Sequence, residues 1–110
     1  EKKLKMSEFK LIDLVDAQAK IAEGGVAIAD IRDPQSFAAG HVENAFLLNN
    51  STMTEFSGIT EFETPVLVFC YHGHSSQGAA QYLASLGYEE VYSVNGGFEM
   101  WKQNFPFVSE

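Results

Sequence analysis

The chain has 110 residues, of which 45% are hydrophobic and 20% charged, which allows one globular domain with a core but not two. Its formal net charge of −8 repels nucleic acid and anionic membranes, so neither is expected as a partner. The single cysteine excludes an internal disulfide, a dithiol motif and a multi-cysteine zinc site. Because no stretch of about 18 residues is apolar enough to span a membrane, we expect a cytoplasmic protein.

The amino end divides into a lysine-rich start and the first predicted elements. We expect residues 1–6 to be a tag remnant or a flexible extension, and residues 7–107 to form the domain. Residues 9–12 predict a strand. Residues 13–25 have a helical pattern that ends at Gly24 and Gly25. Four apolar residues lie on one face of this predicted helix: Leu14, Ala17, Ile21 and Ala22.

The middle of the chain alternates short apolar runs with helical signals. Residues 26–31 predict a buried strand, and Asp33 followed by Pro34 is typical of the N-cap and first residue of a short helix, here up to residue 40. Residues 45–48 predict a third strand. The polar segment 49–64 has no clear period and indicates only a short helix around residues 53–56.

The second half carries two more strands, each followed by a helix. The strands are predicted over residues 66–69 and 91–94, and the closing helix over 97–104, anchored by Phe98 and Trp101. The other helix, over residues 76–86, ends at Gly87. The apolar residues that we assign to one side of it are Ala79, Ala80, Tyr82, Leu83 and Leu86.

Continuous apolar strands separated by helices predict the fold class. We expect a single α/β domain with a mainly parallel five-stranded sheet and helices on both faces. In open sheets of this kind, ligands bind beyond the carboxyl ends of the strands, where the helices begin. Cys70 occupies such a place.

The position of Cys70 favours a reactive thiolate. Backbone N–H groups of the loop and of the first helical turn can donate hydrogen bonds to the sulfur and lower the thiol pKa below about 8.5. Gly73 lets the loop curl around the sulfur, and Ser75 or Ser76 can cap the helix and donate a hydroxyl hydrogen bond. The alternative is that Cys70 is a small buried hydrophobe at a strand end, but the polar, glycine-containing loop argues against it.

Three motifs together resemble one family. They cover residues 30–45 ("DIRDPQSFAAGHVENA"), 70–76 ("CYHGHSS") and 95–101 ("NGGFEMW"). In this order and spacing they resemble a single-domain rhodanese, a thiosulfate sulfurtransferase, most closely the bacterial GlpE-like type. The resemblance extends from about residue 8 to residue 106 and implies a rhodanese-like domain.

The resemblance also implies a mechanism. Cys70 would take the outer sulfur of thiosulfate as a persulfide and pass it to a small thiophilic acceptor, which is cyanide in vitro and thioredoxin or another dithiol as the candidate in the cell. It implies no cofactor and no metal, and we expect a monomer or a weak homodimer. The implied substrate-binding loop consists of Tyr71, His72, Gly73, His74, Ser75 and Ser76.

The loop departs from the family in its charges. Many rhodaneses carry basic residues after the cysteine, whereas here His72 and His74 either supply partial positive charge or are merely solvated. Related phosphatases place an arginine where this chain has Ser76, and its sole arginine is Arg32, so phosphate chemistry is disfavoured. The remaining alternative is a non-catalytic rhodanese-fold module that binds a partner or senses oxidants, although the chain lacks a resolving cysteine.

Three polar residues are assigned to structural support, two of them at the carboxyl end of the strand over residues 26–31 and the third after Gly40. Asp30 and Arg32 could form a catalytic pair, but a partly buried ion pair that anchors the loop leading to His41 is favoured, because polar groups near a strand end need partners. His41 is interpreted as an oriented imidazole that bonds the backbone rather than as an acid or base.

Overall fold

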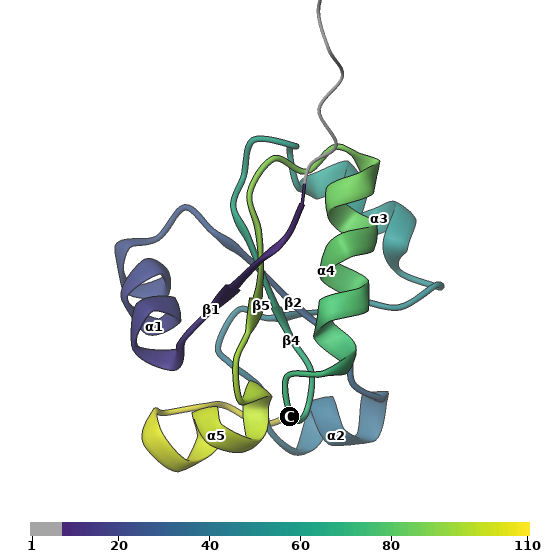
Figure 1. Ribbon diagram of the computed structural model, residues 1–110. Helices are drawn as coiled ribbons and strands as arrows, with labels where there is room; N and C mark the ends of the chain where they lie inside the picture. The colour runs from purple at the N-terminus through teal and green to yellow at the C-terminus, as the bar shows by residue number, and fades with distance from the viewer. Residues whose placement is uncertain (1–7) are drawn as a thin grey trace, which may run out of the picture.

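A single parallel sheet organises the protein (Figure 1). The computed structural model describes residues 8–110, so the expectation for residues 1–6 lies outside the described residues. All strand pairs are parallel, in the order β1-β5-β4-β2-β3, which confirms the predicted fold class. The strands are β1 (Lys10–Ile12), β2 (Ala27–Asp30), β3 (Phe46–Leu47), β4 (Val66–Phe69) and β5 (Val91–Val94).

Helices cover both faces of the sheet, because neighbouring side chains of a buried strand point to opposite faces. In β4, Val66 and Val68 pack with α3 and α4, whereas Leu67 and Phe69 pack with α1 and α5. The short helix α2 lies at the carboxyl end of the strands, at the bottom of Figure 1. The helices are α1 (Leu14–Glu23), α2 (Pro34–Ala39), α3 (Met53–Ile59), α4 (Ser75–Leu86) and α5 (Gly97–Asn104).

Most predicted boundaries agree with these elements, and the helices show the differences. Asp33 caps α2 as predicted, because its carboxylate accepts the backbone N–H of Ser36. Helix α3 continues to residue 59, beyond the short helix predicted around residues 53–56. Of the apolar residues assigned to one side of α4, Tyr82 and Leu86 are 54% and 41% exposed, so only part of that side is buried. The apolar residues of α4 thus extend beyond its buried face. The same is true of α1, where the apolar Ala22 is exposed.

The carboxyl-terminal residues fold back onto the domain. His41 and Val108 exchange backbone hydrogen bonds of 2.8 and 2.9 Å, and the N–H of Glu110 donates to the carbonyl of Ala38 at 2.8 Å. The contacts of the domain thus continue past residue 107 to the last residue of the chain. Among residues 8–110, no helix has both the length and the apolar character needed to cross a bilayer.

Candidate active site

Cys70 lies directly after β4, at the carboxyl edge of the sheet, and is only 5% exposed. The N–H of Gly73 donates to its sulfur at 3.0 Å. The hydroxyl of Ser76 lies 3.2 Å from the same atom. A thiol would donate to that hydroxyl, but a thiolate would accept from it, as it accepts from Gly73. The loop between β4 and α4, together with the first turn of α4, therefore directs hydrogen-bond donors at the sulfur.

These donors set the charge state of the sulfur. Burial raises the pKa of the Cys70 thiol, but the Ser76 hydroxyl and the backbone N–H groups of Ser76, Gly73 and His72 stabilise the thiolate. Their combined effect is larger, so the pKa of Cys70 lies below its ordinary value. At a given pH the site consequently holds more of the sulfur as nucleophilic thiolate than a free thiol would.

A second serine, Ser93 on β5, extends this arrangement. Its hydroxyl lies 2.7 Å from that of Ser76, and both side chains are fully buried. When Ser76 donates to the thiolate, its oxygen is left to accept from Ser93, so the two hydroxyls form a chain that ends at the sulfur. The sequence interpretation missed Ser93. A serine inside the otherwise apolar run of residues 91–94 was the signal that could have revealed it.

We expect Ser76→Ala to make Cys70 less reactive at neutral pH. The substitution removes a hydrogen bond that lowers the thiol pKa, so the rise of the iodoacetamide alkylation rate with pH should move to higher pH. At pH 7 the rate should fall roughly tenfold. Ser85→Ala, which removes an exposed hydroxyl from the same helix, is the control and should match the wild type. Equal profiles for all three proteins would contradict the assigned hydrogen bond.

Helix α5 holds the backbone of the loop. The N–H groups of Phe98 and Glu99 donate to the carbonyls of Cys70 and Tyr71 at 2.8 and 2.9 Å. This approach needs Gly97, which has φ +59°, because a Cβ there would lie 2.5 Å from the Cys70 carbonyl oxygen. The carbonyls thus face α5, and the amides of the loop are left for the sulfur. The sequence interpretation did not assign this role to Gly97.

Gly73 also allows a close backbone approach. It has φ +94°, and a Cβ at this position would lie 2.9 Å from the backbone nitrogen of Gly96. The curled loop that the sequence predicted at this glycine is what brings its N–H to the sulfur.

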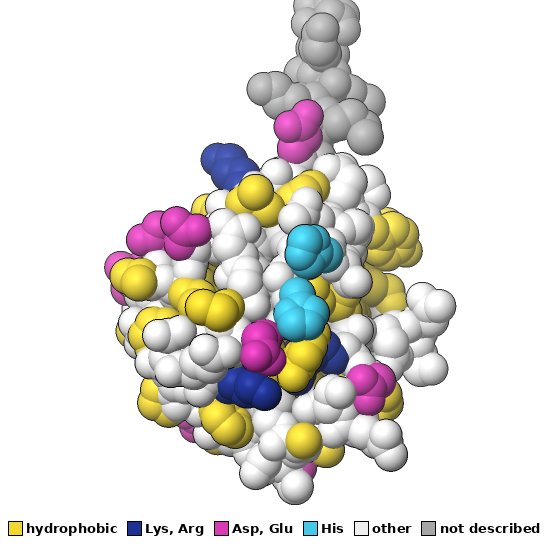
Figure 2. Space-filling model, turned by 60° about the horizontal axis from the view of Figure 1, so that its bottom comes forward, with side chains coloured by type: hydrophobic (Ala, Val, Ile, Leu, Met, Phe, Trp, Pro, Cys, Tyr) yellow, Lys and Arg dark blue, Asp and Glu magenta, His cyan; other side chains and the backbone are white. Residues whose placement is uncertain are grey.

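The other predicted loop residues lie at the surface. Tyr71, His72, His74 and Ser75 are exposed, and Figure 2 shows imidazoles beside charged groups of both signs on this face. The Tyr71 hydroxyl donates to the Glu99 carboxylate, and this bond, with the nearby Lys102 and His72, outweighs burial and holds the pKa of Glu99 below its usual value.

The prediction that a serine caps α4 is wrong. His74 occupies the N-cap position and makes no side-chain cap bond. Ser75 is the first helical residue. The Ser76 hydroxyl is turned inward, where it bonds the sulfur and Ser93 instead of the helix backbone.

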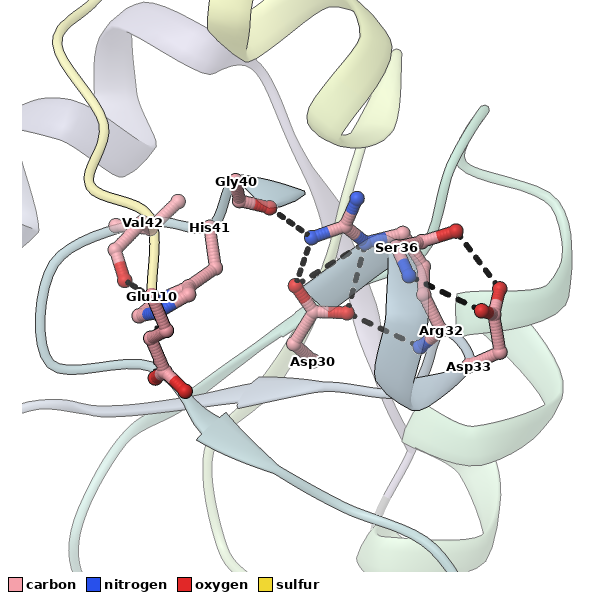
Figure 3. Close-up of polar contacts among 8 residues, drawn as sticks. All are labelled: Asp30, Arg32, Asp33, Ser36, Gly40, His41, Val42 and Glu110. Atoms are coloured by element: carbon pink, nitrogen blue, oxygen red, sulfur yellow. Dashed lines mark hydrogen bonds and ion pairs between the residues drawn. The ribbon is translucent and has the colours of Figure 1, made fainter. Parts of the chain in front are cut away.

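Asp30 and Arg32 form a buried ion pair beside the loop (Figure 3). Arg32 donates from Nε and Nη2 to the Asp30 carboxylate at 3.0 and 2.7 Å, and Nη2 also donates to the Gly40 carbonyl at 2.6 Å. The guanidinium lies over the ring of Phe98, 4.3 Å from its centroid. These contacts join β2, α2 and α5, which supports the structural role predicted for this pair.

His41 is buried, and three contacts fix the orientation of its ring. Its ring stacks on Phe37 at a centroid distance of 3.9 Å, and Nδ1 lies 2.9 Å from the Val42 carbonyl. Nε2 lies 3.1 Å from the Glu110 carboxylate. Figure 3 shows His41 with Val42 and Glu110 beside the Asp30–Arg32 pair. The backbone contact predicted for His41 is present, and it orients the ring.

A pocket of about 350 Å³ opens next to Cys70. Besides the cysteine it is lined by Ile31, Arg32, Asp33, Ser36, Tyr71 and Ser75. A small sulfur compound that enters this pocket can meet the thiolate at the end of β4. The structure thus brings Cys70, Tyr71 and Ser75 together with Arg32, which Asp30 holds in place, whereas His41 bonds the Val42 backbone and does not line the pocket.

Comparison with known proteins points to one family. A sequence profile described as "Rhodanese-like domain" matches residues 13–104. A rhodanese-related protein from Thermoplasma volcanium is 28% identical, with a TM-score of 0.77, over 93% of this chain and 100% of that one. A rhodanese-like domain protein from Staphylococcus aureus is 23% identical, with a TM-score of 0.78, over 93% and 99%. A polysulfide-sulfur transferase from Wolinella succinogenes is 22% identical, with a TM-score of 0.76, over 93% and 80%.

Proposed function

This chain belongs to the family of rhodanese-like domains, and we propose that it is a thiosulfate sulfurtransferase that carries sulfur on Cys70. Membership of this family, with a buried cysteine at the end of β4, supports a sulfurtransferase-type function. The observation that carries the proposal is the convergence of the Gly73 N–H and the Ser76 hydroxyl on the Cys70 sulfur. These donors suit a thiolate, and they also suit the anionic outer sulfur of a persulfide.

In the first step the Cys70 thiolate attacks the outer sulfur of thiosulfate. A new S–S bond forms, the bond between the outer sulfur and the sulfonate sulfur breaks, and sulfite leaves with the electron pair. The loop amides, held in place because α5 binds the Cys70 and Tyr71 carbonyls, are positioned for the charge on the persulfide.

In the second step a thiophilic acceptor removes the outer sulfur. Cyanide carbon attacks it, the S–S bond breaks, thiocyanate leaves, and Cys70 returns to the thiolate. In the cell a dithiol such as thioredoxin is the proposed acceptor. Its first thiol would take the sulfur as a persulfide, and its second would release hydrogen sulfide and close a disulfide. The cytoplasmic location, the GlpE-like type and a monomer or weak homodimer stay predictions.

The test is the intact mass of the protein after incubation with thiosulfate. We expect a gain of one sulfur atom, which disappears when cyanide is added with the release of an equal amount of thiocyanate. Protein whose Cys70 has first been blocked with iodoacetamide should gain nothing. If the unblocked protein gains no sulfur from thiosulfate, the proposed use of thiosulfate is wrong. If no other sulfur donor loads it either, the sulfurtransferase function is wrong and a non-catalytic module is the better description.

A further inference from the structure

The cleft at Cys70 has two adjoining lobes. The inner lobe is the pocket of about 350 Å³ beside the sulfur. The outer lobe is a pocket of about 220 Å³. Arg32, Ser36 and Tyr71 line both, so a ligand can occupy the two lobes together. A compound larger than thiosulfate therefore has room beside its reacting sulfur.

The inner lobe carries a carboxylate that has no ion-pair partner among residues 8–110. Asp33 lines it, and within residues 8–110 no cation pairs with this carboxylate, which accepts hydrogen bonds from the Ser36 hydroxyl and N–H at 2.8 and 3.0 Å. Arg32 lines the same lobe, but its charge is matched by Asp30. A dianion that approaches the Cys70 thiolate thus meets repulsion from Asp33 in addition to the net charge of −8.

The outer lobe is walled largely by apolar groups. Besides the shared residues, it is lined by Phe98 and Phe107, whose rings meet edge to face at a centroid distance of 5.4 Å, and by Ala39 and Gly40. Phe107 is 44% exposed, so its ring is available to a ligand. The ammonium of Lys102 also lines the lobe, 3.7 Å from the Glu99 carboxylate, which offsets its charge. This environment suits an apolar organic group.

We propose that the preferred sulfur donor is a small organic compound with one negative charge and an apolar body, a thiosulfonate or a persulfide, and that Asp33 sets this preference over thiosulfate. The inference rests on the sulfurtransferase function proposed above. With a thiosulfonate, Cys70 attacks the terminal sulfur, the S–S bond to the sulfonyl group breaks, and a sulfinate leaves with the electron pair. With a persulfide, Cys70 attacks the outer sulfur, the S–S bond of the donor breaks, and the organic thiolate leaves with the electron pair. The bonds made and broken are those of the thiosulfate reaction, and no further reactant is needed.

The charge of Asp33 is tested with two donors that differ in charge. Methanethiosulfonate carries the same sulfane sulfur as thiosulfate, but a methyl group replaces one anionic oxygen. Asp33→Asn removes the negative charge and keeps a good N-cap for α2. We expect kcat/KM for thiosulfate to rise roughly threefold to tenfold, and kcat/KM for methanethiosulfonate to rise by about the square root of that factor.

The control is Glu61→Gln, which makes the same change in net charge on the loop that leads into β4, at the opposite end of that strand from Cys70. It should leave both values near those of the wild type. Equal effects of Asp33→Asn and Glu61→Gln, or equal effects of Asp33→Asn on the two donors, would overturn the role of Asp33.

The outer lobe is tested with benzenethiosulfonate, which has the charge of methanethiosulfonate and an aromatic body. We expect it to have the highest kcat/KM of the three donors, and Phe107→Ala to reduce its advantage over methanethiosulfonate roughly threefold or more. Phe62→Ala is the matched control, because Phe62 is similarly exposed and packs on Tyr88, away from the cleft.

The outcomes separate this inference from the proposed function. If the organic donors load Cys70 but thiosulfate has the highest kcat/KM, the donor preference is wrong and the sulfurtransferase function stands. If Phe107→Ala leaves the ratio of kcat/KM for benzenethiosulfonate to kcat/KM for methanethiosulfonate unchanged, the outer lobe does not contribute to the donor preference. If none of the three donors loads Cys70, the proposed function itself is wrong.

Discussion

Cys70→Ser is expected to abolish sulfur loading and to reduce sulfur transfer to cyanide on the order of a thousandfold or more. A serine hydroxyl at this position remains protonated near neutral pH, and its oxygen cannot hold the sulfur as a persulfide. The substitution keeps the size of the side chain and a group that can bond the Gly73 N–H and the Ser76 hydroxyl. Loading is measured by intact mass after thiosulfate, and transfer by the thiocyanate formed.

The fold of this variant should survive. The buried sulfur packs at the edge of the core, and its replacement by oxygen should lower the free energy of unfolding by no more than about 1–2 kcal/mol. Circular dichroism and a denaturant titration check this. A Cys70→Ser protein that still gained sulfur would show that another residue carries it, and would contradict the assignment of the nucleophile.

Arg32→Met is expected to lower the free energy of unfolding by about 3–5 kcal/mol, the largest effect on stability among the predictions. Asp30 is fully buried, and Arg32 donates to both of its carboxylate oxygens. Without the guanidinium, a buried carboxylate loses its counter-charge, and the Gly40 carbonyl loses a bond of 2.6 Å. Urea titration followed by tryptophan fluorescence measures the loss.

Two further variants show whether charge is the cause. Adding Asp30→Asn to Arg32→Met removes the buried negative charge that has lost its partner. The double variant should recover a large part of the lost free energy of unfolding, because a neutral amide costs less to bury than a carboxylate. Lys20→Met breaks the half-exposed ion pair with Glu90 and should cost less than about 1 kcal/mol. Equal losses in Arg32→Met and Lys20→Met would contradict the buried pair as a support of the fold.

The amino-acid sequence predicted most of the framework from local pattern. Apolar runs gave the five strands, and helical spacing between them required a parallel sheet covered on both faces. Asp33 with Pro34 marked the start of α2 because capping depends on neighbours in the chain. The same reasoning placed Cys70 at the carboxyl edge of β4, where a loop and a helix start can surround the sulfur.

Contacts between residues far apart in the chain could not be predicted in this way. The bond between Ser76 and Ser93 exists because α4 and β5 pack together, and nothing near Ser76 in the sequence indicates it. The need for Gly97 likewise depends on α5 approaching the carbonyls of a loop that lies much earlier in the chain. How much of the apolar side of α4 is buried could not be predicted either, because the sheet covers only part of that side and leaves Tyr82 exposed.

The sequence by itself therefore determined the fold class, the position of the thiol and the curl of its loop, because strand period, capping and glycine conformation are local properties. Only the tertiary structure decided which groups surround the sulfur and which charges line its cleft. The pair of Arg32 with Asp30 was already expected from the sequence, but only the folded chain shows that Ser93 completes the hydroxyl chain, that Gly97 lets α5 hold the loop, and that Asp33 has no ion-pair partner within residues 8–110. These depend on packing between distant segments, and packing sets the distances on which hydrogen bonds and charge interactions depend.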